Sequence, residues 1–198
     1  MNSSAFIGLG YNFLQLTINS IEELENQGNK NLLFLDGNLS EDESWLKYDQ
    51  QTKWNDNNIA IPVLFNFYHG IELVLKGLIL KSGKSWNPKK GHHLTLLLNT
   101  LKSCTERPSQ NVIEHFEKII NYDLNNFFDA NNKNVDSFYI LLRYPEASSN
   151  NYFIFNDIRG LGPKGLSTFS EVRSLAKGVK ENIKSWLSES NSQESINN

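Results

Sequence analysis

HGIELVLKGLIL, residues 69–80, is a strongly apolar run that also holds a carboxylate and an ammonium group, Glu72 and Lys76, four residues apart. In a helix each residue turns the chain by about 100°, so residues three and four apart share a face. The polar residues of this region then fall within an arc of roughly 120°: Asn66, His69, Glu72 and Lys76. The other faces are nearly all apolar, which predicts a central helix that is buried on most sides and carries one polar strip.

The polar strip has two interpretations that both stay open. A buried ion pair adds little net stability, because desolvation offsets the Coulomb attraction. Glu72 and Lys76 are therefore not expected to serve stability alone. The strip is either an internal network that fixes the register of the helix or part of a pocket that faces a ligand or RNA. Gly70 and Gly77 lie at its edge, and we expect them to let a neighbouring backbone come close.

Periodicity and capping signals place further helices around this one. We expect them over residues 5–25, 92–104, from 108 to about 128, and 167–187. The central helix is expected to have Pro62 in its first turn and to end at Ser82 and Gly83. Two short runs rich in β-formers, residues 138–144 and 152–155, flank a turn-like segment and predict a β-hairpin.

These elements predict a mainly α fold, an up-and-down helical bundle with a small β-hairpin insertion, residues 138–157, before the last helix. We expect one helical domain over residues 1–187. The tail, residues 188–198, is rich in Ser, Asn, Gln and Glu and is expected to be disordered.

A polar connector over residues 36–58 separates the first helix from the central one. Its Ser40–Glu43 stretch fits a capping box, which predicts a short helix to about Lys53. We expect Trp45 and Trp54 of the connector to dock on the core.

The composition of the chain limits its expected partners and cellular compartment. The 198 residues carry a net charge of −3, so no global basic excess favours a strong electrostatic grip on nucleic acid. The single cysteine, Cys104, excludes an intrachain disulfide and a cysteine-based zinc site and suits a reducing cytoplasm. Polar and charged side chains interrupt the apolar run over residues 59–80, which makes it a poor membrane span. We therefore expect a cytoplasmic protein with no membrane association.

No metal site and no cofactor are expected. The adjacent histidines, His92 and His93, would point to different faces of a helix and would not chelate one ion. The glycines of the chain lack the spacing of a Walker phosphate-binding loop.

Three motifs follow one another along the chain: Glu72-Leu-Val-Leu-Lys76, then Gly91-His92-His93-Leu94 with Leu97-Leu98, then Leu142-Arg143-Tyr144-Pro145. In order and spacing they resemble the motifs of bacterial members of the HEPN superfamily, over roughly residues 60–187. The resemblance implies an all-α up-and-down bundle, commonly a homodimer, found in toxin–antitoxin, phage-defence and RNA-processing proteins.

The same resemblance bears on catalysis. Many catalytic HEPN proteins are metal-independent endoribonucleases with an Arg, four to six further residues and then a His. Here Arg107 alone has a histidine downstream, His115, and seven residues separate the two. Pro108 occupies the position where the signature usually has a polar residue. This departure argues against ribonuclease activity at these two residues, which are the weaker catalytic candidates.

RNA cleavage through the 2′-OH would need a general base and a cation near the phosphate. His92 or His93 could be the base, and Lys76 or Arg143 the cation. We predict that Glu72 and Lys76 meet one of these histidines and Arg143 in space, because buried charges need partners. The candidate binding residues are Asn66, His69, Glu72, Lys76, His92, His93, Arg143 and Tyr144.

Three functions follow as hypotheses. The first is a HEPN-like protein of bacterial defence or stress response that binds RNA, a nucleotide or a protein partner without catalysis. The second is an endoribonuclease toxin with a cognate antitoxin or defence partner. The third is a purely structural dimerisation protein. A homodimer is expected in each case, because the apolar content exceeds what one small bundle easily buries.

Overall fold

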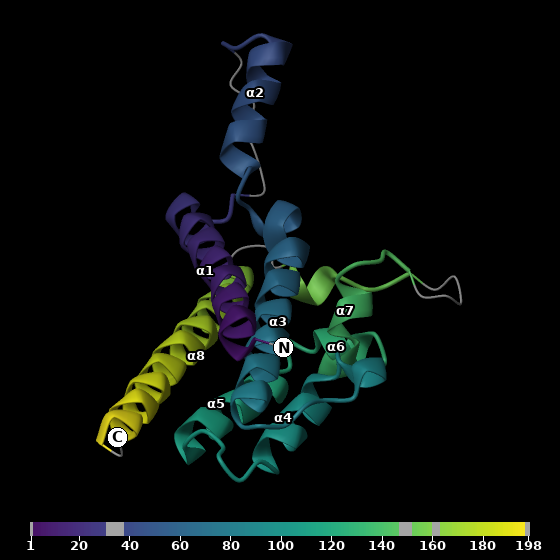
Figure 1. Cartoon of the computed structure of the whole chain (residues 1–198). Helices are drawn as coiled ribbons and strands as arrows, with labels where there is room; N and C mark the ends of the chain where they lie inside the picture. Colours follow the sequence, from purple (N-terminus) through teal and green to yellow (C-terminus); the bar gives the residue numbers. More distant parts are fainter. Residues whose placement is uncertain (1, 31–37, 147–151, 160–162, 197–198) are drawn as a thin grey trace.

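The structure is a computed structural model and describes residues 2–30, 38–146, 152–159 and 163–196. Helices dominate these residues, which confirms the mainly α prediction (Figure 1). The longer helices are α1 (Ser3–Gln27), α2 (Glu41–Thr52), α3 (Asp56–Lys81), α4 (Leu94–Lys102), α5 (Gln110–Ile120) and α8 (Pro163–Ile196). The short ones are η1 (Pro88–Lys90), α6 (Phe127–Ala130), η2 (Val135–Ser137), α7 (Phe138–Leu141) and η3 (Asn156–Ile158).

Helix α3 is the centre of the bundle, as its apolar sequence predicts. Its residues from Gly70 to Ile79 are all buried. The helix begins earlier than expected, because the Asn55 side chain accepts the backbone N–H of Asn58 and caps it. Pro62 therefore lies inside the helix and not in its first turn. The C-terminal end follows the prediction, with Ser82 as the cap and Gly83 in the left-handed region at φ +73°.

Helix α1 packs directly against α3 through glycines. A Cβ added to Gly10 would lie 2.9 Å from the carbonyl oxygen of Gly70 and 2.7 Å from a methyl group of Val74. A Cβ added to Gly77 would lie 3.0 Å from the carbonyl oxygen of Ser3. Such short distances mean that the two backbones approach where side chains are absent, as expected for Gly70 and Gly77.

The other long helices complete the bundle around this pair (Figure 1). Helix α4 contacts α3 and α5, and α8 contacts both α1 and α5. Aromatic side chains fill much of the core, including the fully buried Phe67, Tyr68, Phe116, Phe138 and Phe169. Helix α8 continues through residues 188–196, for which composition predicts a disordered tail.

The predicted β-hairpin is not seen in the described residues. Phe138–Leu141 forms the helical turn α7, and the segment from Tyr152 to Phe155 has no strand. The two segments meet at one isolated antiparallel bridge between Glu146 and Tyr152. The physical reason is that Phe138, Leu141 and Leu142, at helical spacing, are the residues that become buried. The expected turn at residues 147–151 lies outside the described residues.

Helix α2 extends away from the bundle (Figure 1). It begins with the predicted capping box, in which the Ser40 hydroxyl accepts the backbone N–H of Glu43 and the Glu43 carboxylate accepts from Ser40. Trp54 packs against the core as expected. Trp45 does not, because it lies on the extended helix and is 60% exposed.

One helical stretch of the described chain, Glu41–Lys81, is long and apolar enough to span a membrane by composition alone. Its most apolar window is 72% buried inside the protein. Such burial is typical of the core helix of a folded domain.

Candidate functional site

The polar strip of α3 converges on the carboxylate of Glu72, which is 1% exposed. Its Oε1 accepts a hydrogen bond from Nζ of Lys76 at 2.5 Å. Its Oε2 lies 3.0 Å from Nδ1 of His92 and 3.6 Å from Nδ1 of His69. Two imidazoles and one ammonium group thus surround a single buried carboxylate. We call His69, Glu72, Lys76 and His92 the imidazole site.

The partners of Glu72 keep it ionised. Burial alone would raise its pKa, but hydrogen bonds from His69, Lys76 and His92 and the charge of Lys76 lower the pKa of Glu72 to about 2. At neutral pH the carboxylate and the ammonium group cancel in charge.

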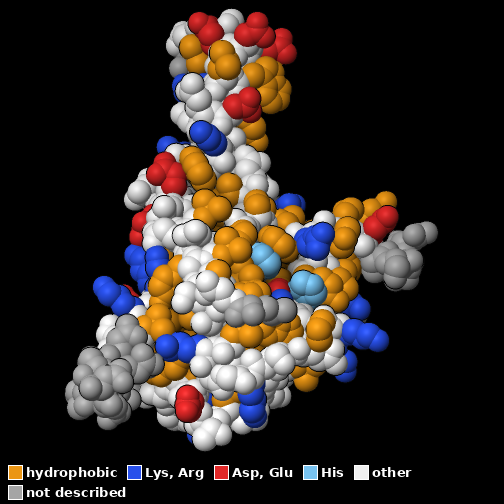
Figure 2. All heavy atoms as spheres, in the orientation of Figure 1, with side chains coloured by type: hydrophobic (Ala, Val, Ile, Leu, Met, Phe, Trp, Pro, Cys, Tyr) orange, Lys and Arg blue, Asp and Glu red, His pale blue; other side chains and the backbone are white. Residues whose placement is uncertain are grey.

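Aromatic rings hold both imidazoles in place. The ring of His92 stacks on that of Tyr139, with centroids 4.8 Å apart and planes inclined by 30°. His69 stacks on Phe65 at 5.6 Å and meets the edge of Phe13 at 4.8 Å. Figure 2 shows two histidine side chains on one face of the protein, among hydrophobic side chains. The His92 side chain is 52% exposed and that of His69 27%, so solvent reaches both rings.

The segment between α3 and α4 places His92 on the same face of the protein as His69. Nζ of Lys76 lies 5.3 Å from the ring centroid of Trp86, a cation–π contact that covers the buried ammonium group. Gly91 is buried against the same indole, because a Cβ there would lie 3.2 Å from Nε1 of Trp86. The close fit at Gly91 positions the next residue, His92, over Glu72.

His93 has a different environment. It is the N-cap residue of α4, and its Nδ1 lies 3.8 Å from Oδ2 of Asp136. The other carboxylate oxygen of Asp136 accepts the backbone N–H of Thr95 at 2.8 Å, which stabilises the start of α4. His93 therefore belongs to a helix cap beside the imidazole site and does not contact Glu72.

The other predicted binding residues, Asn66, Arg143 and Tyr144, are not part of the imidazole site. Arg143 is exposed, and its guanidinium lies over the ring of Tyr144 at 5.4 Å. No ion pair joins Arg143 to Glu72 among the described residues. Tyr144 is 50% exposed, and Asn66 is partly buried on α3. Arg143 stays at the surface because it follows the helical turn α7, whose apolar residues alone face inward.

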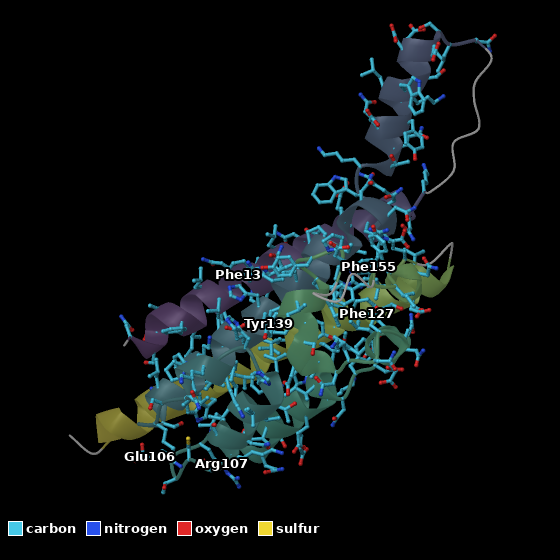
Figure 3. The ribbon with its side chains drawn as sticks, turned by 90° about the vertical axis from the view of Figure 1, so that its right-hand side faces the viewer. Phe13, Glu106, Arg107, Phe127, Tyr139 and Phe155 are labelled. Carbon is cyan, nitrogen blue, oxygen red and sulfur yellow. The ribbon has the colours of Figure 1, made fainter. Side chains whose placement is uncertain are left out.

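The weaker catalytic pair is not assembled. Nε2 of His115 lies 2.9 Å from the carbonyl oxygen of Leu175, and its ring packs on Gly178 of α8. Arg107 is exposed and donates to the carbonyl oxygen of Lys102 at 3.1 Å. Figure 3 places Arg107 at one end of the protein, well away from Tyr139, whose ring stacks on His92 of the imidazole site. His115 thus joins helices α5 and α8, and Arg107 closes a loop.

Several residues of the site are not evident from sequence reasoning. Tyr139, Phe65 and Trp86 cover the rings and the ammonium group, and Asp136 caps α4. The spacing of Phe65 and His69 on one helix is a signal that could have identified their stacking. Tyr139 lies on the helical turn α7 and Trp86 on the segment between α3 and η1, and neither carries such a signal.

The arrangement can bind and can exchange protons. Nδ1 of His92 is occupied by the carboxylate, so its Nε2 is available to a ligand on the exposed side. The rings offer apolar and stacking surface beside this nitrogen. In the described part of the chain, no group of three or more His, Cys, Asp or Glu side chains is arranged so that it could hold a metal ion.

Comparison of the chain with known protein families gives one match. The family model described as HEPN domain matches residues 57–190, more than half of the chain. This match confirms the resemblance to the HEPN superfamily. No curated protein and no solved structure matches the chain.

Proposed function

Because the chain belongs to the HEPN family, we propose that it is a cytoplasmic, homodimeric protein of bacterial defence or stress response. In this proposal it binds RNA at the imidazole site and does not cleave it. The observation that carries the proposal is the half-exposed His92, which Glu72 holds at 3.0 Å and Tyr139 supports by stacking. When one ring nitrogen of a histidine is hydrogen-bonded to a carboxylate, the other nitrogen can recognise a ligand group by its role as hydrogen-bond donor or acceptor.

The hydrogen bond to Glu72 assigns the tautomer of neutral His92. With the proton on Nδ1 donated to the carboxylate, Nε2 becomes an acceptor. The ligand group opposite it must then be a donor, such as a ribose 2′-OH or an exocyclic amine of a base. A 2′-OH is the group by which a protein distinguishes RNA from DNA.

The charge and the aromatic rings favour single-stranded RNA. Glu72 and Lys76 neutralise each other, and the chain carries a net charge of −3, so phosphate attraction is weak. Binding of single strands draws instead on base stacking, which contributes about 1–3 kcal/mol per base. The rings of Phe13, Phe65 and Tyr139 beside the histidines supply surface for such stacking.

We expect no cleavage because of where the structure places Arg107 and His115, the pair that most resembles the signature. His115 is engaged by Leu175 inside the bundle, and Arg107 lies at a remote loop. A metal-free ribonuclease needs a base and a phosphate-binding cation held together. This requirement is not met by Arg107 and His115.

One observation favours an endoribonuclease as a second candidate. A carboxylate that orients Nδ1 of a histidine leaves Nε2 able to act as a general base, and Glu72 and His92 have this geometry. Under this candidate the cell would need a cognate antitoxin or defence partner protein to restrain the activity.

The test is incubation of the purified protein with total RNA and with tRNA in EDTA. We expect intact RNA and a measurable protein–RNA complex. Parallel variants are Lys76→Ala, His92→Ala, His93→Ala and Arg143→Ala. Cleavage by the wild type that disappears in a folded His92→Ala variant would replace the binding proposal with the endoribonuclease. Neither binding nor cleavage would leave the third, purely structural function.

The proposed homodimer rests on the surface of the protein. Large apolar side chains stay exposed on several elements, among them Leu9 at 49% and Leu16 at 50% on α1. Exposed large apolar side chains such as these support self-association.

A further inference from the structure

Helix α2 is an arm that the bundle does not bury. It extends from the body of the protein (Figure 1), and its Trp45 and Leu46 are 60% and 62% exposed. An isolated helix of twelve residues is marginal in water, even with a good cap. Tryptophan is also the residue most enriched among interface hot spots. An arm with these side chains at its surface is suited to pack against a partner.

The exposed face of the arm has a defined charge pattern. Trp45, Leu46 and Asp49 lie three, four and seven residues after Asp42, and all four side chains are exposed. They therefore form one stripe, with an apolar pair in the middle and a carboxylate on either side. At 1.5 Å per residue, the seven-residue separation of the two aspartates corresponds to about 10 Å along the helix.

A hollow between α1 and α8 has the complementary pattern. It encloses about 480 Å³ and is lined by Tyr11, Gln15, Ile18, Glu22, Lys177, Lys180, Glu181 and Lys184. Tyr11 and Ile18 form its apolar floor. Lys177 and Lys184 lie seven residues apart on α8, which again corresponds to about 10 Å. Lys177 pairs with Glu22 at 2.7 Å, and Glu181 lines the hollow as well, so its three lysines exceed its two carboxylates by one positive charge. The two end lysines thus have the spacing of the two aspartates of the arm.

We propose that the arm of one protomer docks in the α1–α8 hollow of a second copy, with Trp45 and Leu46 over Tyr11 and Ile18. Asp42 and Asp49 then face Lys177 and Lys184. The inference deepens the proposed homodimer by naming its surface, and it rests on that self-association. It does not depend on RNA binding, because no residue of the imidazole site takes part.

The occupant is a second copy for a geometric reason. In one chain the arm rises above α1 and α3 and points away from α8, so it does not lie in the hollow of its own chain (Figure 1). Two copies related by a twofold axis can exchange arms, and each then fills the hollow of the other. The interface is used twice, which doubles its apolar and charge contacts.

The experiment is a charge exchange measured by light scattering coupled to size-exclusion chromatography. One variant carries Asp42→Lys and Asp49→Lys, and the other carries Lys177→Glu and Lys184→Glu. Each alone is expected to dissociate at least tenfold more readily than the wild-type dimer. Their equimolar mixture is expected to restore the dimer, because each arm then meets a hollow of opposite charge. RNA binding of the variants is recorded separately.

Controls separate docking from folding. Trp45→Ala with Leu46→Ala is expected to dissociate the dimer and to gain nothing from mixing. Glu106→Lys, at an exposed site away from both surfaces, should leave the dimer unchanged. A wild type that is monomeric at tens of micromolar overturns the proposal. So does a dimer that survives the Trp45 and Leu46 changes, or charge variants that stay monomeric on mixing while circular dichroism shows them folded.

Discussion

Glu72 and His92 lie twenty residues apart in the sequence, and the structure brings Oε2 of the carboxylate to 3.0 Å from Nδ1 of the imidazole. This contact joins the buried centre of α3 to the exposed loop before α4. One carboxylate therefore supports both the core, through Lys76, and the solvent-facing site, through His92. Changes at Glu72 should alter stability and binding together.

Replacing the buried carboxylate is expected to be costly. Glu72→Gln leaves the ammonium group of Lys76 buried without its counter-charge, and removal of one member of a buried pair destabilises by roughly 3–5 kcal/mol. Urea unfolding at pH 7 measures the loss. The matched control is Glu117→Gln, which breaks the surface ion pair with Lys102 and should cost less than about 1 kcal/mol. Equal effects of the two changes would show that Glu72 is not a buried partner.

Acid should remove the contribution of Glu72 over a defined range. Its pKa falls from 4.5 to about 2 on folding. A lowered pKa stabilises the folded state above the unfolded value and loses this effect as pH falls. The difference in unfolding free energy between wild type and Glu72→Gln should shrink by about 3 kcal/mol between pH 4.5 and pH 2. A difference that stays constant over this range would contradict the assigned pKa.

The contact between α1 and α3 predicts opposite effects at two glycines of one helix. Gly10→Ala places a methyl group 2.9 Å from the carbonyl oxygen of Gly70 and should destabilise by about 1–3 kcal/mol. Gly8→Ala meets nothing within 4 Å and should stabilise by roughly 0.5–1 kcal/mol through helix propensity. Thermal unfolding of both variants measures the pair. Similar shifts in Tm would mean that the helices do not approach at Gly10.

His115 is expected to act on stability and not on RNA. His115→Ala removes the bond to the Leu175 carbonyl and should cost about 1–3 kcal/mol. RNA affinity should stay within twofold of wild type, because the residue lies away from the imidazole site. Arg107→Ala should change neither quantity. Loss of RNA binding in folded variants at both positions would restore the signature pair as a functional site.

Much of the fold follows from the sequence because apolar periodicity and capping residues act locally. The buried length of α3, its cap at Ser82 and the capping box of α2 all have such signals. The hairpin prediction is wrong at Phe138. The β-forming residue types of this segment favour a strand in the sequence, and the helical spacing of its buried residues spans only one turn, which is too short to be recognised. The conformation of that segment is determined by its packing against α3 and not by the β-propensity of its residues.

The site is predictable to the extent that it lies on one helix. His69, Glu72 and Lys76 share a face of α3, so their meeting follows from helical spacing. The contact with His92 depends on how the loop folds over Trp86, which the spacing of motifs does not determine. Arg143 illustrates the same limit, since it follows the helical turn α7 and its side chain is exposed to solvent.

The most direct test of the account is RNA affinity at the Glu72–His92 contact. Fluorescence anisotropy with a labelled single-stranded RNA, and with DNA of the same sequence, gives the dissociation constants for wild type, His92→Ala and the neighbouring control His93→Ala. We predict preference for RNA, at least tenfold weaker RNA binding by His92→Ala, and no more than a twofold change for His93→Ala. A folded His92→Ala variant that binds RNA as tightly as wild type would contradict the proposal.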